Sequence, residues 1–85
     1  MQKYEFIPEG VCSKKISFEL DNENRIHNLL FVGGCNGNLK AIGVILEGLD
    51  ASKVIEKLDG NICGSRNTSC ADQLALALKL ALKRK

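Results

Sequence analysis

The sequence has little proline and no long apolar run, and each absence excludes a class of protein. One proline among 85 residues excludes a collagen-like chain, and without about 20 consecutive apolar residues no membrane-spanning helix is expected. The 12 basic and 10 acidic residues leave a formal charge of +2, so no nucleic-acid footprint follows. The start of the chain, Met1 to Glu5, has no basic region followed by an apolar one, so we expect no secretory signal and predict a cytoplasmic protein.

The remaining composition is that of a small globular domain, with 45% apolar and 26% charged residues. Residues 1–85 suffice for one domain but not for a large enzyme, because such a chain buries only about 60 to 65 per cent of its unfolded surface. Ordering each residue costs roughly 1.5 kcal/mol of conformational entropy. In so small a domain this cost nearly cancels the free energy gained by burying apolar surface, so the net free energy of folding is close to zero. A bound metal or a partner subunit would therefore help it to fold.

The first half of the chain alternates between apolar and polar residues, which indicates strands. Three segments alternate in this way: 2–7, 14–20 and 25–32. The second is the clearest, because Ile16, Phe18 and Leu20 face one way along it. Pro8 ends the first segment, and the polar residues 21–24 are typical of a hairpin loop. We therefore predict a meander of three antiparallel strands.

The second half changes to a helical period after a glycine-rich turn at residues 33–38. Asn38, Asp50 and Ser69 are the candidate N-caps of three helices, and Ser69 forms a capping-box pattern with Asp72. The expected apolar positions of the first two helices are Leu39, Ile42, Ile45 and Leu46, then Ala51, Val54, Ile55 and Leu58. The sequence thus predicts an α+β fold of two layers, a three-stranded antiparallel β-meander followed by about three helices packed on one face.

The last expected helix carries two apolar stripes. The first stripe consists of Leu74, Leu78, Ala81 and Leu82. Leu76 and Leu80 begin the second, displaced by about 160 to 200 degrees from Leu78. Only one stripe can meet the sheet, and an exposed apolar stripe usually marks an association surface. We therefore expect a two-fold homodimer packed through this helix, the alternative being a monomer in which the second helix covers Leu76 and Leu80.

Four cysteines require an explanation: Cys12, Cys35, Cys63 and Cys70. Their spacing matches no zinc-finger pattern, but each falls in a turn or at the end of an expected element rather than on an apolar face. This placement favours a shared thiolate site, while packed thiols and disulfides remain as alternatives. Four thiolates suit zinc, at about 2.3 Å per bond, or an iron–sulfur cluster. A third possibility is that Cys63 and Cys70 exchange electrons as a redox pair.

Four further features are weaker candidates for a site. His27, in the third strand, is expected to be a cross-strand surface residue rather than a ligand or a base. The turn at residues 33–38 can cradle a phosphate, but it lacks the lysine and the hydroxyl residue of a P-loop. We expect Arg66 to be an exposed loop residue rather than an anion-binding one. Asp72 is expected to stabilise a helix end rather than to bind metal or act as a base.

The segment 68–73, Thr-Ser-Cys-Ala-Asp-Gln, resembles the signature of the TSCPD domain family, with Ala71 where the family has proline. Proline suits the first turn of a helix, so alanine loosens the preorganisation slightly and leaves the thiol and the carboxylate in place. Three further blocks resemble the short, free-standing, four-cysteine branch of the family: 8–13, 31–38 and 63–64. The resemblance covers nearly the whole chain.

This resemblance implies a link to ribonucleotide reduction. Longer relatives carry the domain at the C-terminus of adenosylcobalamin-dependent ribonucleotide reductases, and short members often inherit the name ribonucleoside-diphosphate reductase. A chain of 85 residues has no room for the reductase barrel, the radical-site cysteines or a cobalamin pocket, so it cannot reduce a ribonucleotide alone.

The expected function is therefore a four-cysteine metal-binding module, accessory or regulatory to ribonucleotide reduction and deoxyribonucleotide supply. Its expected zinc ligands are Cys12, Cys35, Cys63 and Cys70. The alternatives are a thiol redox donor and an iron–sulfur cluster carrier resembling scaffold proteins. The expected partners are a ribonucleotide reductase or another protein, and neither nucleic acid nor a membrane.

Overall fold

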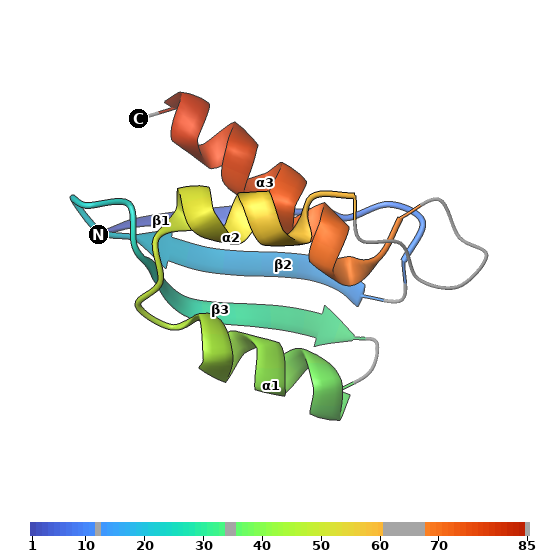
Figure 1. The fold of residues 1–85 in the computed structure, drawn as a ribbon. Coiled ribbons are helices and arrows are strands. Elements are labelled where there is room, and N and C mark those ends of the chain that lie inside the picture. Colours follow the sequence, from blue (N-terminus) through green and yellow to red (C-terminus); the bar gives the residue numbers. More distant parts are fainter. Residues whose placement is uncertain (12, 34–35, 61–67, 85) are drawn as a thin grey trace.

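The computed structural model describes residues 1–11, 13–33, 36–60 and 68–84, which form a sheet followed by three helices. The strands are β1 (Gln2–Phe6), β2 (Ser13–Leu20) and β3 (Ile26–Gly33). They are hydrogen-bonded in the order β1-β2-β3, and both pairs are antiparallel, with Tyr4 opposite Phe18 and Ile16 opposite Phe31. The predicted meander is therefore confirmed (Figure 1).

A β-bulge in β3 changes which of its residues face the core. Asn28 and Leu29 of β3 both lie opposite Phe18 of β2, and Asn28 has a left-handed φ of 54°. Asparagine tolerates this conformation better than most residues, and the first residue of one common bulge type adopts it. Because of the extra residue, Ile26 and Phe31 are both buried on the inner face although an odd number of positions separates them.

Three helices follow the sheet: α1 (Asn36–Leu46), α2 (Ala51–Leu58) and α3 (Cys70–Arg84). The helix α1 lies along β3, whereas α2 and α3 pack against each other and α3 also contacts β2 (Figure 1). Asp50 caps α2 as predicted, since its carboxylate accepts the backbone N–H of Ser52 at 2.9 Å. No helix within the described ranges is long and apolar enough to cross a membrane.

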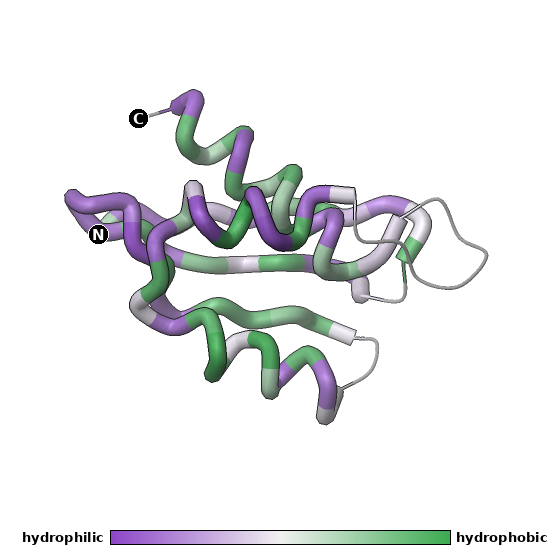
Figure 2. The backbone as a smooth tube through the Cα atoms, in the orientation of Figure 1, coloured by the Kyte–Doolittle hydropathy of each residue, from purple (hydrophilic) through white to green (hydrophobic). Residues whose placement is uncertain are grey.

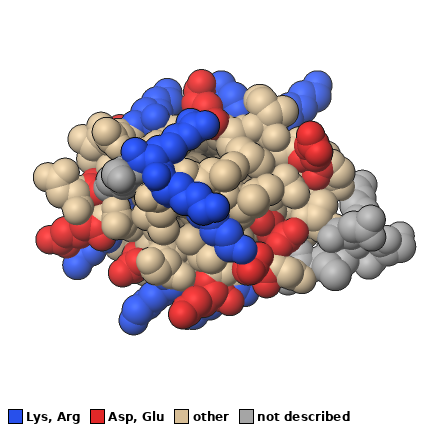
Figure 3. Space-filling model, turned by 90° about the horizontal axis from the view of Figure 1, so that it is seen from above, with Lys and Arg blue, Asp and Glu red and all other residues tan. Residues whose placement is uncertain are grey.

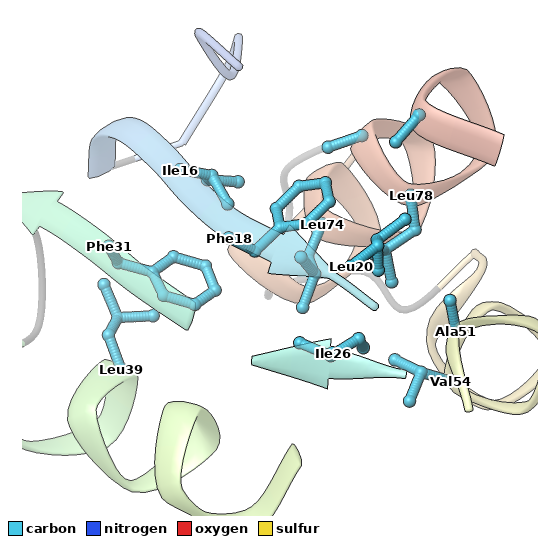
Figure 4. Packing of buried hydrophobic residues seen from close by; sticks show 12 residues of the cluster. Ile16, Phe18, Leu20, Ile26, Phe31, Leu39, Ala51, Val54, Leu74 and Leu78 are labelled. Carbon is cyan, nitrogen blue, oxygen red and sulfur yellow. The ribbon is translucent and has the colours of Figure 1, made fainter. Parts of the chain in front are cut away.

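One hydrophobic core lies between the inner face of the sheet and the helices (Figure 4). Its largest fully buried side chains are Ile16, Phe18, Leu20, Ile26, Leu74 and Leu78. Burial of each such side chain contributes about 1.5 to 3 kcal/mol relative to exposure. The helix α1 adds Leu39, and α2 adds Ala51 and Val54. The predicted two-layer α+β fold is therefore present, with α2 and α3 joined to the sheet through one core.

The helix α1 differs from the prediction at two positions. It begins at Asn36, so Asn38 lies inside the helix and is not its N-cap. Ile45, expected on the buried stripe, is 69% exposed, whereas Leu39 is buried. The reason is that α1 packs mainly against the edge strand of the sheet, and Ile45 lies about 100° round the helix from Leu46, beyond that narrow contact.

The backbone of α1 approaches β3 at Gly43. A Cβ atom at this position would lie 2.8 Å from the carbonyl oxygen of Leu29, closer than real Cβ atoms come to other atoms. The missing side chain therefore lets the helix touch the edge of the strand.

On α3, the first predicted apolar stripe faces the core and the second lies partly in solvent. Leu74 and Leu78 are fully buried, while Leu76 and Leu80 are 41% and 40% exposed. Seen over α3, Lys and Arg side chains cross the middle of the surface and Asp and Glu side chains lie around them (Figure 3). This face therefore carries charges of both signs.

Candidate cysteine site at the start of α3

The structure describes one of the four cysteines that we predict to form a site. Cys70 is the first residue of α3, and its side chain is partly exposed. Cys12, Cys35 and Cys63 lie outside the described residues, as does Arg66. The sulfur of Cys70 lies near the positive end of the helix dipole, where negative charge is stabilised.

A buried serine joins Cys70 to the start of β2. The Oγ atom of Ser13 lies 3.3 Å from the Sγ atom of Cys70, and Ser13 is 3% exposed. Ser13 also pairs with Gly33, the last residue of β3. In the sequence, Ser13 follows Cys12 directly and Gly33 stands two positions before Cys35. The structure therefore brings sequence neighbours of two other cysteines to the end of the sheet where Cys70 lies.

Ser69 and Asp72 organise the first turn of α3. The Oγ atom of Ser69 accepts the backbone N–H of Asp72 at 3.1 Å, which confirms the predicted cap. The carboxylate of Asp72 accepts the hydroxyl of Thr68 and, at 2.6 Å, the backbone N–H of Gly60. The bond from Thr68 first, and then the bond from Gly60, hold the pKa of Asp72 below its usual value. Asp72 is thus a helix-end residue, as expected, and it also ties the end of α2 to the start of α3.

Gln73 connects the same turn to the loop after β1. Its Oε1 atom accepts the backbone N–H of Glu9, and its Nε2 atom donates to the Oγ1 atom of Thr68, both at 3.2 Å. Gly10, with a φ of 72°, lies so close that an added Cβ would be 3.4 Å from the methyl group of Thr68. The loop after β1 is therefore held against the start of α3.

A hydrogen-bonded group that we call the α3 cluster consists of Thr68, Ser69, Asp72 and Gln73. It surrounds the first turn that Cys70 begins and joins the loop after β1, the end of α2 and the start of α3. The capping pattern revealed Ser69 and Asp72 in the sequence. It did not reveal Thr68 and Gln73, for which the only signal was the block 68–73, or Ser13, for which the only signal was the block 8–13.

The predicted four-thiolate site stays a prediction. Within the ranges that the structure describes, no group of three or more His, Cys, Asp or Glu side chains is placed to hold a metal ion. Those ranges contain only Cys70 of the four expected ligands. They show part of the surroundings of that one sulfur, which include a buried hydroxyl and a helix N-terminus.

His27 lies at the opposite end of β3, between two carboxylates. Its Nε2 atom is 2.8 Å from Oδ2 of Asp21, and its Nδ1 atom is 2.7 Å from Oε2 of Glu47. The other oxygen of Glu47 accepts the backbone N–H of Asn28 at 2.8 Å. The bonds to Asp21 and then to Glu47 raise the pKa of His27, while the backbone bond from Arg25 and then the bond from His27 lower the pKa of Asp21 to about 2. His27 is the surface residue that we expected, and the structure adds its two acidic partners.

Together, the fold and the α3 cluster define a class of small α+β domain in which polar side chains surround a cysteine at a helix start. The chain belongs to the TSCPD domain family, because the TSCPD domain model of that family matches residues 1–82. The pentapeptide for which the family is named corresponds to residues 68–72, which supply most of the α3 cluster. Neither the comparison with curated proteins nor that with solved structures found a match.

Proposed function

We propose that the chain is a small zinc-binding module that is accessory to ribonucleotide reduction. The proposed ligands are Cys12, Cys35, Cys63 and Cys70. The observation that carries the proposal is the contact between Ser13 and Cys70 at 3.3 Å, because Ser13 adjoins Cys12 and pairs with Gly33. This contact supports a convergence of cysteine-bearing segments at one end of the sheet.

The surroundings of Cys70 suit a thiolate ligand. The start of α3 stabilises negative charge, and the hydroxyl of Ser13 lies within donating distance of the sulfur. A hydroxyl that donates to a ligand sulfur is a typical outer contact of a metal site. Bound zinc would supply the cross-link between distant segments that so small a domain needs.

The chemistry of four thiolates favours a structural or interaction role. Four sulfur ligands complete a tetrahedral zinc site and leave no open position for water or substrate. The family link to adenosylcobalamin-dependent reductases gives the context, since the TSCPD domain model matches residues 1–82. The module therefore acts on a reductase, or on another protein partner in deoxyribonucleotide supply, through its surface.

Metal analysis of protein purified without oxygen tests the ligand set. We expect about one zinc per chain, and loss of this zinc in Cys70→Ser. Iron with visible absorption would identify an iron–sulfur carrier instead. Metal-free protein that reduces a disulfide through Cys63 and Cys70 would replace the zinc module with a thiol redox donor.

The accessory role has a separate test. The zinc-loaded chain is added to a purified adenosylcobalamin-dependent ribonucleotide reductase, and the reaction rate and the mass of the complex are measured. We expect a complex or a changed rate with the unmodified chain and neither with Cys70→Ser. A zinc-loaded chain that does not bind the reductase or alter its rate would overturn the accessory role and leave the metal site in place.

A further inference from the structure

The outer side of α1 is apolar although it faces solvent. Val44 and Ile45 are 70% and 69% exposed, and Leu30 on the neighbouring strand β3 is 57% exposed. The second half of α1 is largely green in Figure 2, whereas α2 and α3 alternate between green and purple. An exposed apolar patch usually marks an association surface. The inner side of α1 already meets β3, so its outer side lacks a cover within the described part of the chain.

Small residues make this outer side accessible to another helix. At about 100° per residue, Gly37 and Ala41 lie within about 60° of Val44. Both are exposed, and no atom lies within 4 Å of a Cβ built on Gly37. Helices approach each other closely where such residues alternate with an apolar one. We call Gly37, Lys40, Ala41, Val44 and Ile45 the α1 outer face.

One charge of each sign borders Val44 on the side of β3. Lys40 precedes Val44 by four residues and lies about 40° to that side of it, and Glu47, which directly follows the last residue of α1, lines the same groove as Lys40 and Val44. Lys40, Val44, Glu47 and Leu30 line one open groove between α1 and β3. The midpoint of Lys40 and Glu47 falls between Gly43 and Val44. If a second copy is turned end for end about that midpoint, the Glu47 that follows its α1 lies beside Lys40, and its Lys40 lies beside Glu47.

We propose that the α1 outer face is the interface of a homodimer, in which two α1 helices pack antiparallel about a two-fold axis near Val44. The surface is self-complementary, as a two-fold interface requires, since apolar residues meet in the middle and opposite charges meet on the flank. Leu30 of each copy extends the apolar area beyond the helix. This interface differs from the one expected on α3, where Leu76 and Leu80 are less exposed than Val44.

Light scattering at micromolar concentration tests the interface with a matched pair of variants. We expect twice the chain mass for the unmodified protein and for Leu76→Glu, and the single-chain mass for Val44→Glu. Both variants place glutamate at an exposed apolar position of a helix, and Leu76 is less exposed than Val44, so a general loss of stability would affect Leu76→Glu at least as strongly. A monomeric unmodified protein would overturn the proposal, and so would a dimer that Leu76→Glu breaks and Val44→Glu leaves intact.

Charge reversal tests the antiparallel arrangement. Lys40→Glu sets two acidic groups against each other in each half of the interface, and we expect the dimer dissociation constant to rise by about tenfold. The double variant Lys40→Glu, Glu47→Lys restores opposite charges and should recover the dimer. Glu47 also binds His27, so melting curves of both variants must show that they are folded. Equal dimer affinity in Lys40→Glu and the unmodified protein would exclude this packing of α1 on α1.

Discussion

Polar contacts lie at both ends of the β2–β3 hairpin, but the residues that make them come from one sequence segment at one end and from distant segments at the other. The end at which β2 begins and β3 ends lies beside the α3 cluster, which surrounds the first turn of α3. All residues of this cluster come from the single block 68–73. At the other end, Asp21 and His27 come from a turn and a strand, and Glu47 directly follows helix α1. A local block can be recognised in the sequence, whereas contacts between distant segments exist only in the folded chain.

Removing the metal proposed at the cysteine end should have the largest effect. Structural zinc contributes about 10 kcal/mol or more to folding, which matches the whole stability of a typical domain. We therefore expect that a strong chelator, or Cys70→Ser, abolishes the cooperative melting transition measured by circular dichroism. His27→Gln, at the other end, serves as a control and should keep its sensitivity to chelator. Unchanged melting curves with chelator and in Cys70→Ser would instead indicate packed thiols.

Loss of the Asp72 carboxylate should be the next largest effect. Asp72→Ala removes the bonds to Thr68 and Gly60, which costs about 2 kcal/mol of unfolding free energy in urea titrations. Asp59→Ala is the control, because Asp59 makes an exposed ion pair with Lys79 at 2.9 Å that is worth less than about 1 kcal/mol. Equal losses in the two variants would show that the α3 cluster adds nothing beyond an ordinary surface pair.

A smaller effect is expected from the hydroxyl beside Cys70. Ser13→Ala removes a donor to the proposed ligand sulfur and should weaken zinc binding by about tenfold in competition with a chromophoric chelator. Ser17→Ala is the matched control, since Ser17 is also buried on β2, at 6% exposure. Ser13→Thr keeps the hydroxyl and should restore the affinity. If both alanine variants bind zinc equally, Ser13 does not act on the metal site.

The smallest effect should be the pH dependence of the histidine end. His27 has a pKa above its ordinary value of 6.5, so its contribution to stability is present below that value and is lost as the pH rises through the raised pKa. Asp21 acts in the opposite sense: its contribution is present above its ordinary value of 3.8 and is lost as the pH falls towards about 2.

Urea unfolding from about pH 5 to pH 9 measures the alkaline part of this dependence. The unmodified protein should lose stability as the pH rises, and His27→Gln should flatten the curve because the titrating group is gone. An identical decline in both proteins would place the pH dependence elsewhere.

The features that the sequence predicted correctly depend on interactions between residues that are close together in the chain. The strands and the caps at Asp50 and Ser69 depend on neighbouring residues, so alternation and capping patterns were enough to predict them. The bulge at Asn28 could not be predicted, because it depends on the register between two strands. The same holds for Ile45, whose exposure follows from the position of α1 at the sheet edge.

In the candidate site, too, the sequence revealed local contacts and missed contacts between distant segments. Local capping chemistry revealed Asp72, while its bond to Gly60 needed the packing of α2 beside α3. The approach of Ser13 to Cys70 spans most of the chain and left no local signal. The convergence of the four cysteines remains a prediction that the metal analysis tests.

At Gly43 the backbone of α1 lies so close to the carbonyl oxygen of Leu29 that a side chain on this residue would force the helix away from β3. The side chains of Val44 and Ile45 lie mostly in solvent, so we expect substitutions there to leave the position of the helix unchanged. Position 43 has no such freedom, since even a methyl group must push the helix away from the strand. We expect related chains that do not dimerise through α1 to differ at Ala41, Val44 and Ile45, while glycine persists at position 43.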